Sequence, residues 1–214
     1  MHEFTQAILA VGVPRDTIVY LIGLPVLATL IAFARQIVGI KGFGIYTSLL
    51  LALSLVALGA KYGLATFVTI LVVGTFTRFL IKKLRLTYLP RMALLITVVS
   101  LALLVMFYAA GYFARAGIFA TSILAVLIML SLIEKFISAQ IEKGGKAAIL
   151  LILETLALAL TSYYLITWKS FQKIILEFPV LIITGSIVFN ILLGKWTGLR
   201  LFERWRFREI LKKI

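Results

Sequence analysis

One acidic side chain lies inside a long apolar run, and its type and position make it the first residue to consider for chemistry. Glu154 lies about eight residues into the run 147–167. A charge in hydrocarbon costs about 2–3.5 kcal/mol, and such residues serve as proton or cation relays, as ligand contacts or as ties between helices. The Leu and Ile residues of the run contribute roughly −0.3 to −0.6 kcal/mol each, so insertion of this helix is still favoured.

Glu154 needs a partner, and two polar residues near the ends of other apolar runs are candidates. Arg78 and Asn190 form with it a candidate intramembrane polar network. At helical spacing (i, i+3, i+7, i+10) Glu154 shares a stripe with Ala157, Thr161 and Tyr164, which we expect to face the interior of the bundle. Two interpretations stay open: a relay or ligand contact, and a carboxyl that ties helices together. The second is favoured.

Residues for known catalytic arrangements are missing. The chain has no cysteine, and its one histidine is His2. The eight acids are scattered along the sequence, without an HExxH motif or a carboxylate pair. These features exclude thiolate chemistry and histidine-based zinc sites, and they predict a protein that is not an enzyme and holds no metal or cofactor.

The elements that must position Glu154 are apolar runs of membrane-spanning length. Of the 214 residues 63% are apolar and the mean hydropathy is +1.13, far above the roughly 45–50% apolar content of soluble domains. An α-helix needs about 20 residues to cross the hydrocarbon core. The runs are 17–34, 43–60, 62–81, 90–113, 116–133, 147–167 and 174–193. We therefore predict an all-α polytopic membrane protein, a bundle of seven transmembrane helices.

The distribution of basic residues predicts the orientation. Between the runs, 17 Lys and Arg residues fall on one side and 5 on the other. Basic loops stay in the cytoplasm, which places the N-terminus outside and the C-terminus inside. The net charge of +14 then reflects this topology. It should attract anionic lipid headgroups, and we do not expect it to indicate nucleic-acid binding. The expected location is the plasma (inner) membrane, as a multi-pass protein.

The sequence divides into three parts. Residues 1–16 form an extracytoplasmic lead-in, 17–193 the bundle and 194–214 a basic amphipathic cytoplasmic tail. After the first run, Gly39, Gly42 and Gly44 permit positive φ, and their GxxGxG spacing favours a tight turn over a phosphate-binding loop. The fifth helix is expected to continue past the membrane and to stop at Gly144-Gly145.

Several stretches resemble one family, the seven-helix membrane domain usually fused to an inactive transglutaminase-like domain. They are FARQIVGIKGFG (33–44), RLTYLPR (85–91), IEKF (133–136), EKG (142–144) and NILLGKWTGLR (190–200). The resemblance implies seven helices and a transglutaminase-like part before the first helix. Only about 16 residues precede the first run here, so we expect a membrane part without that outer domain. It also implies a system that contains a cytoplasmic protein akin to ATP-grasp glutamate ligases.

Together these patterns predict a scaffold, anchor or signal-transducing component that is not catalytic. It would dock the ligase-like protein, or bind lipid headgroups, on its cytoplasmic face. The candidate docking residues are Arg35, Gln36, Lys41, Glu134, Glu142, Lys195 and Arg200. The alternative is a small-solute or proton-coupled transporter that uses Glu154. A seven-helix sensor is less favoured, since the sequence indicates no ligand pocket.

Overall fold

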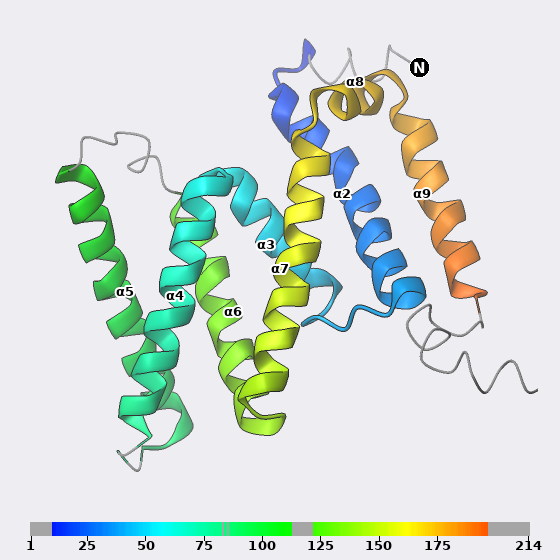
Figure 1. Ribbon diagram of the computed structural model, residues 1–214. Coiled ribbons are helices and arrows are strands. Elements are labelled where there is room, and N and C mark those ends of the chain that lie inside the picture. The colour runs from blue at the N-terminus through cyan, green and yellow to red at the C-terminus, as the bar shows by residue number, and fades with distance from the viewer. Residues whose placement is uncertain (1–9, 83, 85, 113–121, 197–214) are drawn as a thin grey trace, which may run out of the picture. The chain divides into compact units, whose positions relative to one another are not determined.

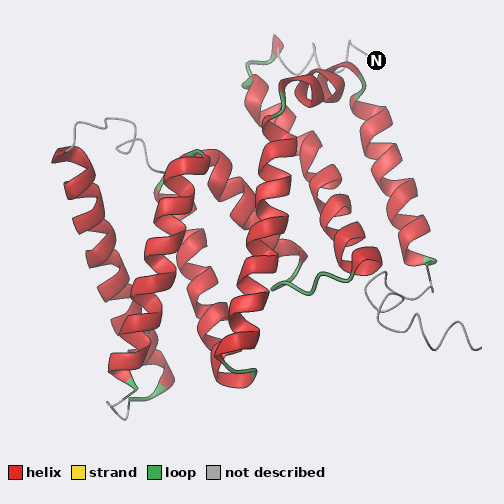
Figure 2. Ribbon diagram, in the orientation of Figure 1, coloured by secondary structure: helices red, strands yellow, loops and turns green. Residues whose placement is uncertain are grey.

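The computed structural model describes residues 10–82, 84, 86–112 and 122–196, and every regular element in these ranges is a helix (Figures 1 and 2). The elements are α2 (Arg15–Phe33), the π-helical turn η1 (Ala34–Val38), α3 (Ile45–Leu58), α4 (Ala60–Ile81), α5 (Tyr88–Tyr112), α6 (Ile123–Glu142), α7 (Gly145–Thr167), α8 (Lys169–Glu177) and α9 (Pro179–Gly194).

The predicted fold class, an all-α polytopic membrane protein, is confirmed. Among the described residues, five helices are long and apolar enough to cross a membrane, and α8 with α9 would make a sixth if counted as one bent span. The predicted run 43–60 corresponds to α3, which has 14 residues and is shorter than a usual span. The start of the predicted run 116–133 lies outside the described residues.

The predicted span 174–193 is wrong as one straight helix. The chain breaks at Phe178, where α8 and α9 meet at 98°. The reason is local: Pro179 has no N–H to donate and disfavours helical geometry at the residue before it, and Phe178 has φ −129° and ψ 55°. The apolar span therefore begins at Pro179, and α8 is a separate amphipathic helix.

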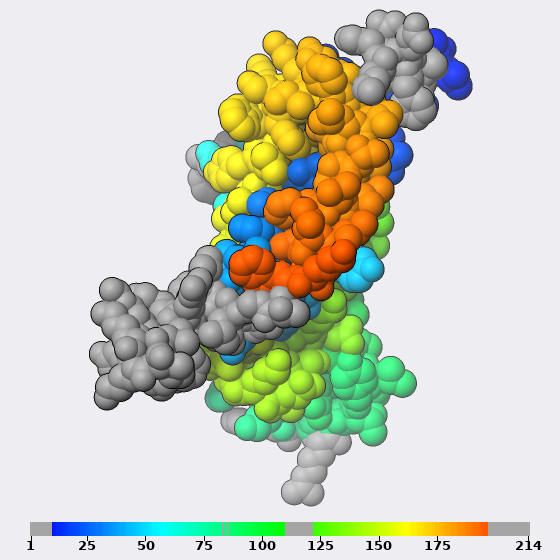
Figure 3. Space-filling view, turned by 90° about the vertical axis from the view of Figure 1, so that its right-hand side faces the viewer, coloured from blue at the N-terminus to red at the C-terminus, as the bar shows by residue number. Residues whose placement is uncertain are grey.

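The chain forms two compact units. Unit 1 comprises residues 1–49 and 154–214, and unit 2 comprises residues 50–153. In unit 1, α2 packs against α9 and α8, and α8 lies across the end of this unit at which α9 begins (Figure 1). Figure 3 shows α9 covering part of α2 on one face of unit 1. The α8 side chain of Gln172 donates to the carbonyl of Ile166 at 3.0 Å, near the end of α7.

Unit 2 is built on α4, which packs against both α5 and α6. The polar and small residues of α4 that could bind helices together in lipid are buried: Thr66, Gly74 and Thr77. Gly74 permits a close approach of α4 to α6, because a Cβ at this position would lie 2.4 Å from Cδ1 of Ile133 on α6. α6 ends at Glu142 and is followed by Gly144 with φ 85°, which confirms the predicted stop at Gly144-Gly145.

Candidate functional site

The glycine-rich turn that follows η1 has the conformation expected from its sequence. Gly39, Gly42 and Gly44 have φ of 98°, 44° and 122°, respectively. The N–H of Gly39 donates to the carbonyl of Ala34 at 3.0 Å and closes the π-helical turn. Positive φ turns the next amides of the backbone toward one side, which is the geometry of an anion-binding nest.

An internal carboxylate occupies this nest. Oε2 of Glu154 accepts hydrogen bonds from the backbone N–H groups of Lys41 and Gly42, each at 2.8 Å. Oγ1 of Thr155 accepts a third, from the N–H of Phe43, at 2.9 Å. Three consecutive amides of the turn are thus bound to two consecutive side chains of α7. All of these residues belong to unit 1.

This arrangement favours the structural interpretation of Glu154. Its carboxylate satisfies backbone donors that a turn within or beside a membrane would otherwise leave unpaired, and hydrogen bonds to a charged acceptor contribute roughly 1.5–3 kcal/mol each. The amides that could have cradled a phosphate are already bound to Glu154 and Thr155. The turn therefore serves as a fixed junction between α2 and α7.

The structure shows hydrogen bonds of the two expected partners of Glu154 to other residues. Nδ2 of Asn190 donates to Oγ1 of Thr29 at 2.6 Å and to the carbonyl of Ser186 at 2.8 Å, and so joins α9 to α2. Nη1 of Arg78 donates to Oε1 of Gln140 on α6. Glu154 binds the backbone amides of Lys41 and Gly42 rather than a side chain. The reason is that the N–H groups of an irregular turn lack the partners that a regular helix provides.

The stripe predicted to face inward from α7 is exposed instead. Ala157 and Thr161 are exposed, and Tyr164 is 64% exposed. The buried face of α7 carries Thr155, Leu158, Ala159, Ser162 and Ile166. The prediction of the buried face was wrong because the sequence of an almost uniformly apolar helix hardly indicates which face is buried.

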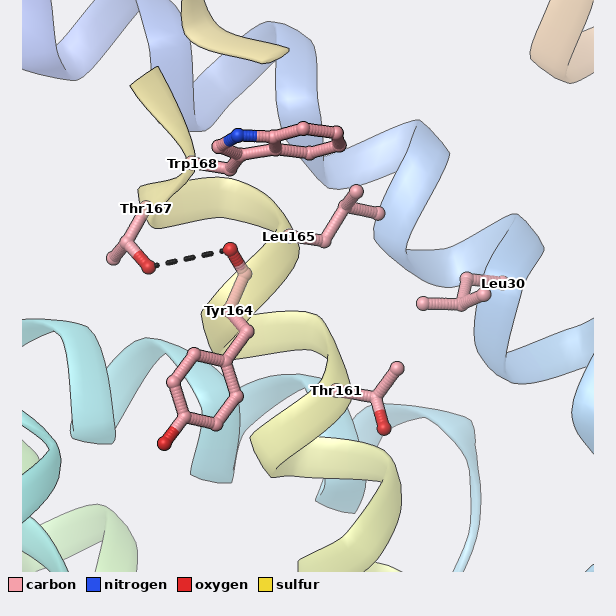
Figure 4. A pocket seen from close by; sticks show the side chains of 6 residues that line it. All are labelled: Leu30, Thr161, Tyr164, Leu165, Thr167 and Trp168. Carbon is pink, nitrogen blue, oxygen red and sulfur yellow. Dashed lines mark hydrogen bonds between the residues drawn. The ribbon is translucent and has the colours of Figure 1, made fainter. Parts of the chain in front are cut away.

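An open groove in unit 1 lies along the exposed face of α7, and Figure 4 shows its lining. It encloses ≈ 610 Å³ and is lined by Leu30, Thr161, Tyr164, Leu165, Thr167 and Trp168. The hydroxyl of Thr167 donates within α7, to the carbonyls of Tyr163 at 2.7 Å and Tyr164 at 3.4 Å. The lining residues carry no charged side chain, so the groove offers no group for acid–base or metal chemistry.

The predicted docking residues in unit 1 have different environments. Lys41 is exposed, and so is Lys195 at the C-cap of α9. Nε2 of Gln36 donates to the carbonyl of Leu193 at 2.6 Å, so this side chain joins η1 to the end of α9. Arg35 is half-buried, with Nη1 fully buried and without a hydrogen-bond partner. The lysines are available to a partner, whereas Gln36 has a structural role.

The remaining docking residues lie on α6 of unit 2 or outside the described part of the chain. Glu134 is exposed and accepts a hydrogen bond from the hydroxyl of Tyr88. Glu142 is exposed at the end of α6. Arg200, and all of the predicted tail after Trp196, lie outside the described residues.

Sequence analysis did not identify Thr155 or Gln140, both of which bind predicted site residues or the turn. A signal existed for Thr155, since it stands next to Glu154 in an otherwise apolar run. Among the described residues, no group of three or more His, Asp or Glu side chains could hold a metal ion.

The comparison with protein families identifies the chain. A family model described as 7 transmembrane helices usually fused to an inactive transglutaminase matches residues 3–211. The chain belongs to this family. As a member of the 7TM-transglutaminase family it is a multi-pass membrane protein, and the match includes the glycine-rich turn and Glu154. Neither curated proteins nor solved structures provide a match to the chain.

Proposed function

We propose that this member of the 7TM-transglutaminase family is a non-catalytic membrane scaffold that docks a cytoplasmic protein. The observation that carries the proposal is the glycine-rich turn. Its amides are bound internally by Glu154 and Thr155, while the side chain of Lys41 remains exposed. A fixed turn with an outward charge is suited to recognition of an acidic protein surface, because the rigid backbone loses little entropy on binding.

The docking surface in unit 1 combines two positions. Lys41 follows η1, and Lys195 follows α9. The hydrogen bond from Gln36 to Leu193 holds the end of η1 against the end of α9, so both lysines lie at the same end of this unit. By the distribution of basic residues this end is cytoplasmic. The resemblance of the sequence suggests an ATP-grasp ligase-like protein as the partner.

Capture of the purified ligase-like protein by the full chain in nanodiscs of neutral lipid tests this proposal. Charge reversal at Lys41 or Lys195 should weaken capture about tenfold or more, because a like charge replaces an attractive pair. The matched controls are charge reversals at Lys169 and Lys173, which are exposed on α8 at the other end of unit 1. Equal capture by all four variants and the original protein would exclude docking at this surface.

A proton-coupled carrier is the second candidate, supported by the position of Glu154 in an apolar helix. In a carrier the carboxylate must exchange its hydrogen bonds with Lys41 and Gly42 for a proton or a solute. Glu154→Gln should then abolish pH-driven uptake in vesicles while the protein remains folded. Unchanged uptake would remove the support for this candidate and leave the scaffold untouched.

A further inference from the structure

Unit 2 contains a cationic cavity that the scaffold function does not use. It encloses ≈ 360 Å³, within the range of small-molecule sites, and is lined by Arg78, Lys82, Arg91, Ile137, Gln140 and Ile141. Three of these described residues carry a positive charge and none carries a negative charge. The electrostatic potential in the cavity is therefore positive, and its apolar walls of low dielectric constant strengthen it.

The residues that line the cavity come from the ends of three helices, α4, α5 and α6. Arg78 lies in the last turn of α4, Lys82 is its C-cap, and Arg91 lies in the first turn of α5. Gln140 comes from the last turn of α6. A cavity between the ends of spans lies at the level of the lipid headgroups rather than in the hydrocarbon core.

The basic side chains retain capacity for an anion. Arg91 donates from Nη2 to the carbonyl of Leu86 at 2.9 Å, while its Nε is fully buried without a hydrogen-bond partner. Arg78 uses Nη1 to bind the neutral oxygen of Gln140, which leaves its charge uncompensated by that contact. Buried donors of a guanidinium group are costly when unpaired, and an oxyanion is the acceptor that fits two or more of them.

The acids of α6 are not part of the described lining. Glu134 accepts its hydrogen bond from Tyr88, and Glu142 is exposed beyond Gln140. The other lining residues are apolar: Ile137 is buried, and Ile141 is 58% exposed. The cavity thus offers cationic donors beside an apolar surface, which matches a phosphate attached to a glycerol and an acyl chain.

We propose that this cavity binds the phosphate group of an anionic phospholipid. Arg78, Lys82 and Arg91 would contact the phosphate oxygens, and Ile141 the first carbons of the lipid. A soluble phosphate ester also offers anionic phosphate oxygens and is the other source of this chemistry. The position at the helix ends and the exposed isoleucine favour the lipid.

Native mass spectrometry of the full chain in neutral detergent tests the proposal. Titrated with phosphatidylglycerol, the protein should bind one molecule at least about tenfold more tightly than phosphatidylcholine. Arg91→Gln should remove this preference, and Lys82→Gln should reduce it severalfold. Lys82 is exposed, so its variant keeps the test valid even if Arg91→Gln unfolds the protein.

Lys146→Gln is the matched control, because it removes an exposed positive charge that does not line the cavity. The proposal is overturned if Lys82→Gln and Lys146→Gln bind phosphatidylglycerol equally well, or if the original protein shows no preference for it. A soluble competitor separates the two sources of phosphate. Displacement of the lipid by an equal concentration of glycerol phosphate would identify a soluble ligand and overturn the assignment to lipid, whereas retention of the lipid supports it.

Discussion

Within each of the two units, a different kind of contact is prominent. In unit 1, side chains bind backbone groups of distant segments: Glu154 and Thr155 bind the turn, and Gln36 binds the end of α9. In unit 2, the helices meet through close apolar packing around Gly74 and Ile133. The glycine-rich turn between η1 and α3 belongs to unit 1, and in a membrane each irregular N–H and C=O needs a partner from the protein. In unit 2 the hydrogen bond from Arg78 to Gln140 accompanies this packing between α4 and α6.

Loss of the Glu154 carboxylate should reduce stability the most, and this effect should arise in unit 1. Glu154→Ala leaves the amides of Lys41 and Gly42 without their acceptor, so we expect the free energy of unfolding to fall by about 2–4 kcal/mol. Glu154→Gln keeps an acceptor oxygen and should lose less than half as much. Denaturant unfolding in one detergent measures both. Glu142→Ala is the exposed control, and an equal loss in it would refute the role of Glu154.

Gly74→Ala should cause the next largest loss of stability, and this loss should arise in unit 2. The added Cβ overlaps Cδ1 and Cγ1 of Ile133, at 2.4 and 2.6 Å, and such overpacking costs about 1–3 kcal/mol. Ile133→Val removes Cδ1, so the double variant should recover part of the stability. A double-mutant cycle measures this recovery. Strictly additive losses would contradict the packing contact.

Gly42→Ala sharpens the comparison by altering the turn without removing a side chain. Gly42 has φ 44°, and a Cβ would lie 3.2 Å from Oγ1 of Thr155. An L-residue in left-handed geometry costs about 1–2 kcal/mol, and we expect thermal unfolding to show this loss. Gly185→Ala in α9 is the control, because a Cβ there meets nothing within 4 Å. It should be neutral or slightly stabilising.

Asn190→Ala should have the smallest effect. It removes the hydrogen bond to Thr29 that joins α9 to α2, and such bonds between membrane helices average about 0.6 kcal/mol. Thermal unfolding of Asn190→Ala and of Thr29→Val should give similar small losses, and the double variant should add little. A loss above 2 kcal/mol would mean that unit 1 depends on this bond as much as on Glu154.

Much of the fold could be predicted because it depends on local properties of the chain. Apolar runs of span length predicted the helices, and Gly144 predicted the end of α6. Pro179 also indicates the bend at Phe178, but the bend was not predicted because the residues on both sides of it form one apolar run. The buried face of α7 could not be predicted, since both faces of a membrane helix are apolar and periodicity is weak.

The sequence by itself determined that this is an α-helical membrane protein of the 7TM-transglutaminase family, with a sharp glycine turn after its first span. Only the tertiary structure decided that Glu154 binds the amides of that turn and that Arg78, Lys82 and Arg91 line one cavity. The physical reason is that hydropathy and glycine conformation are properties of neighbouring residues. Every residue except proline has the same backbone N–H group, so the residue type does not indicate its partner. For Lys41 and Gly42 the partner is decided only when segments more than 100 residues apart come together.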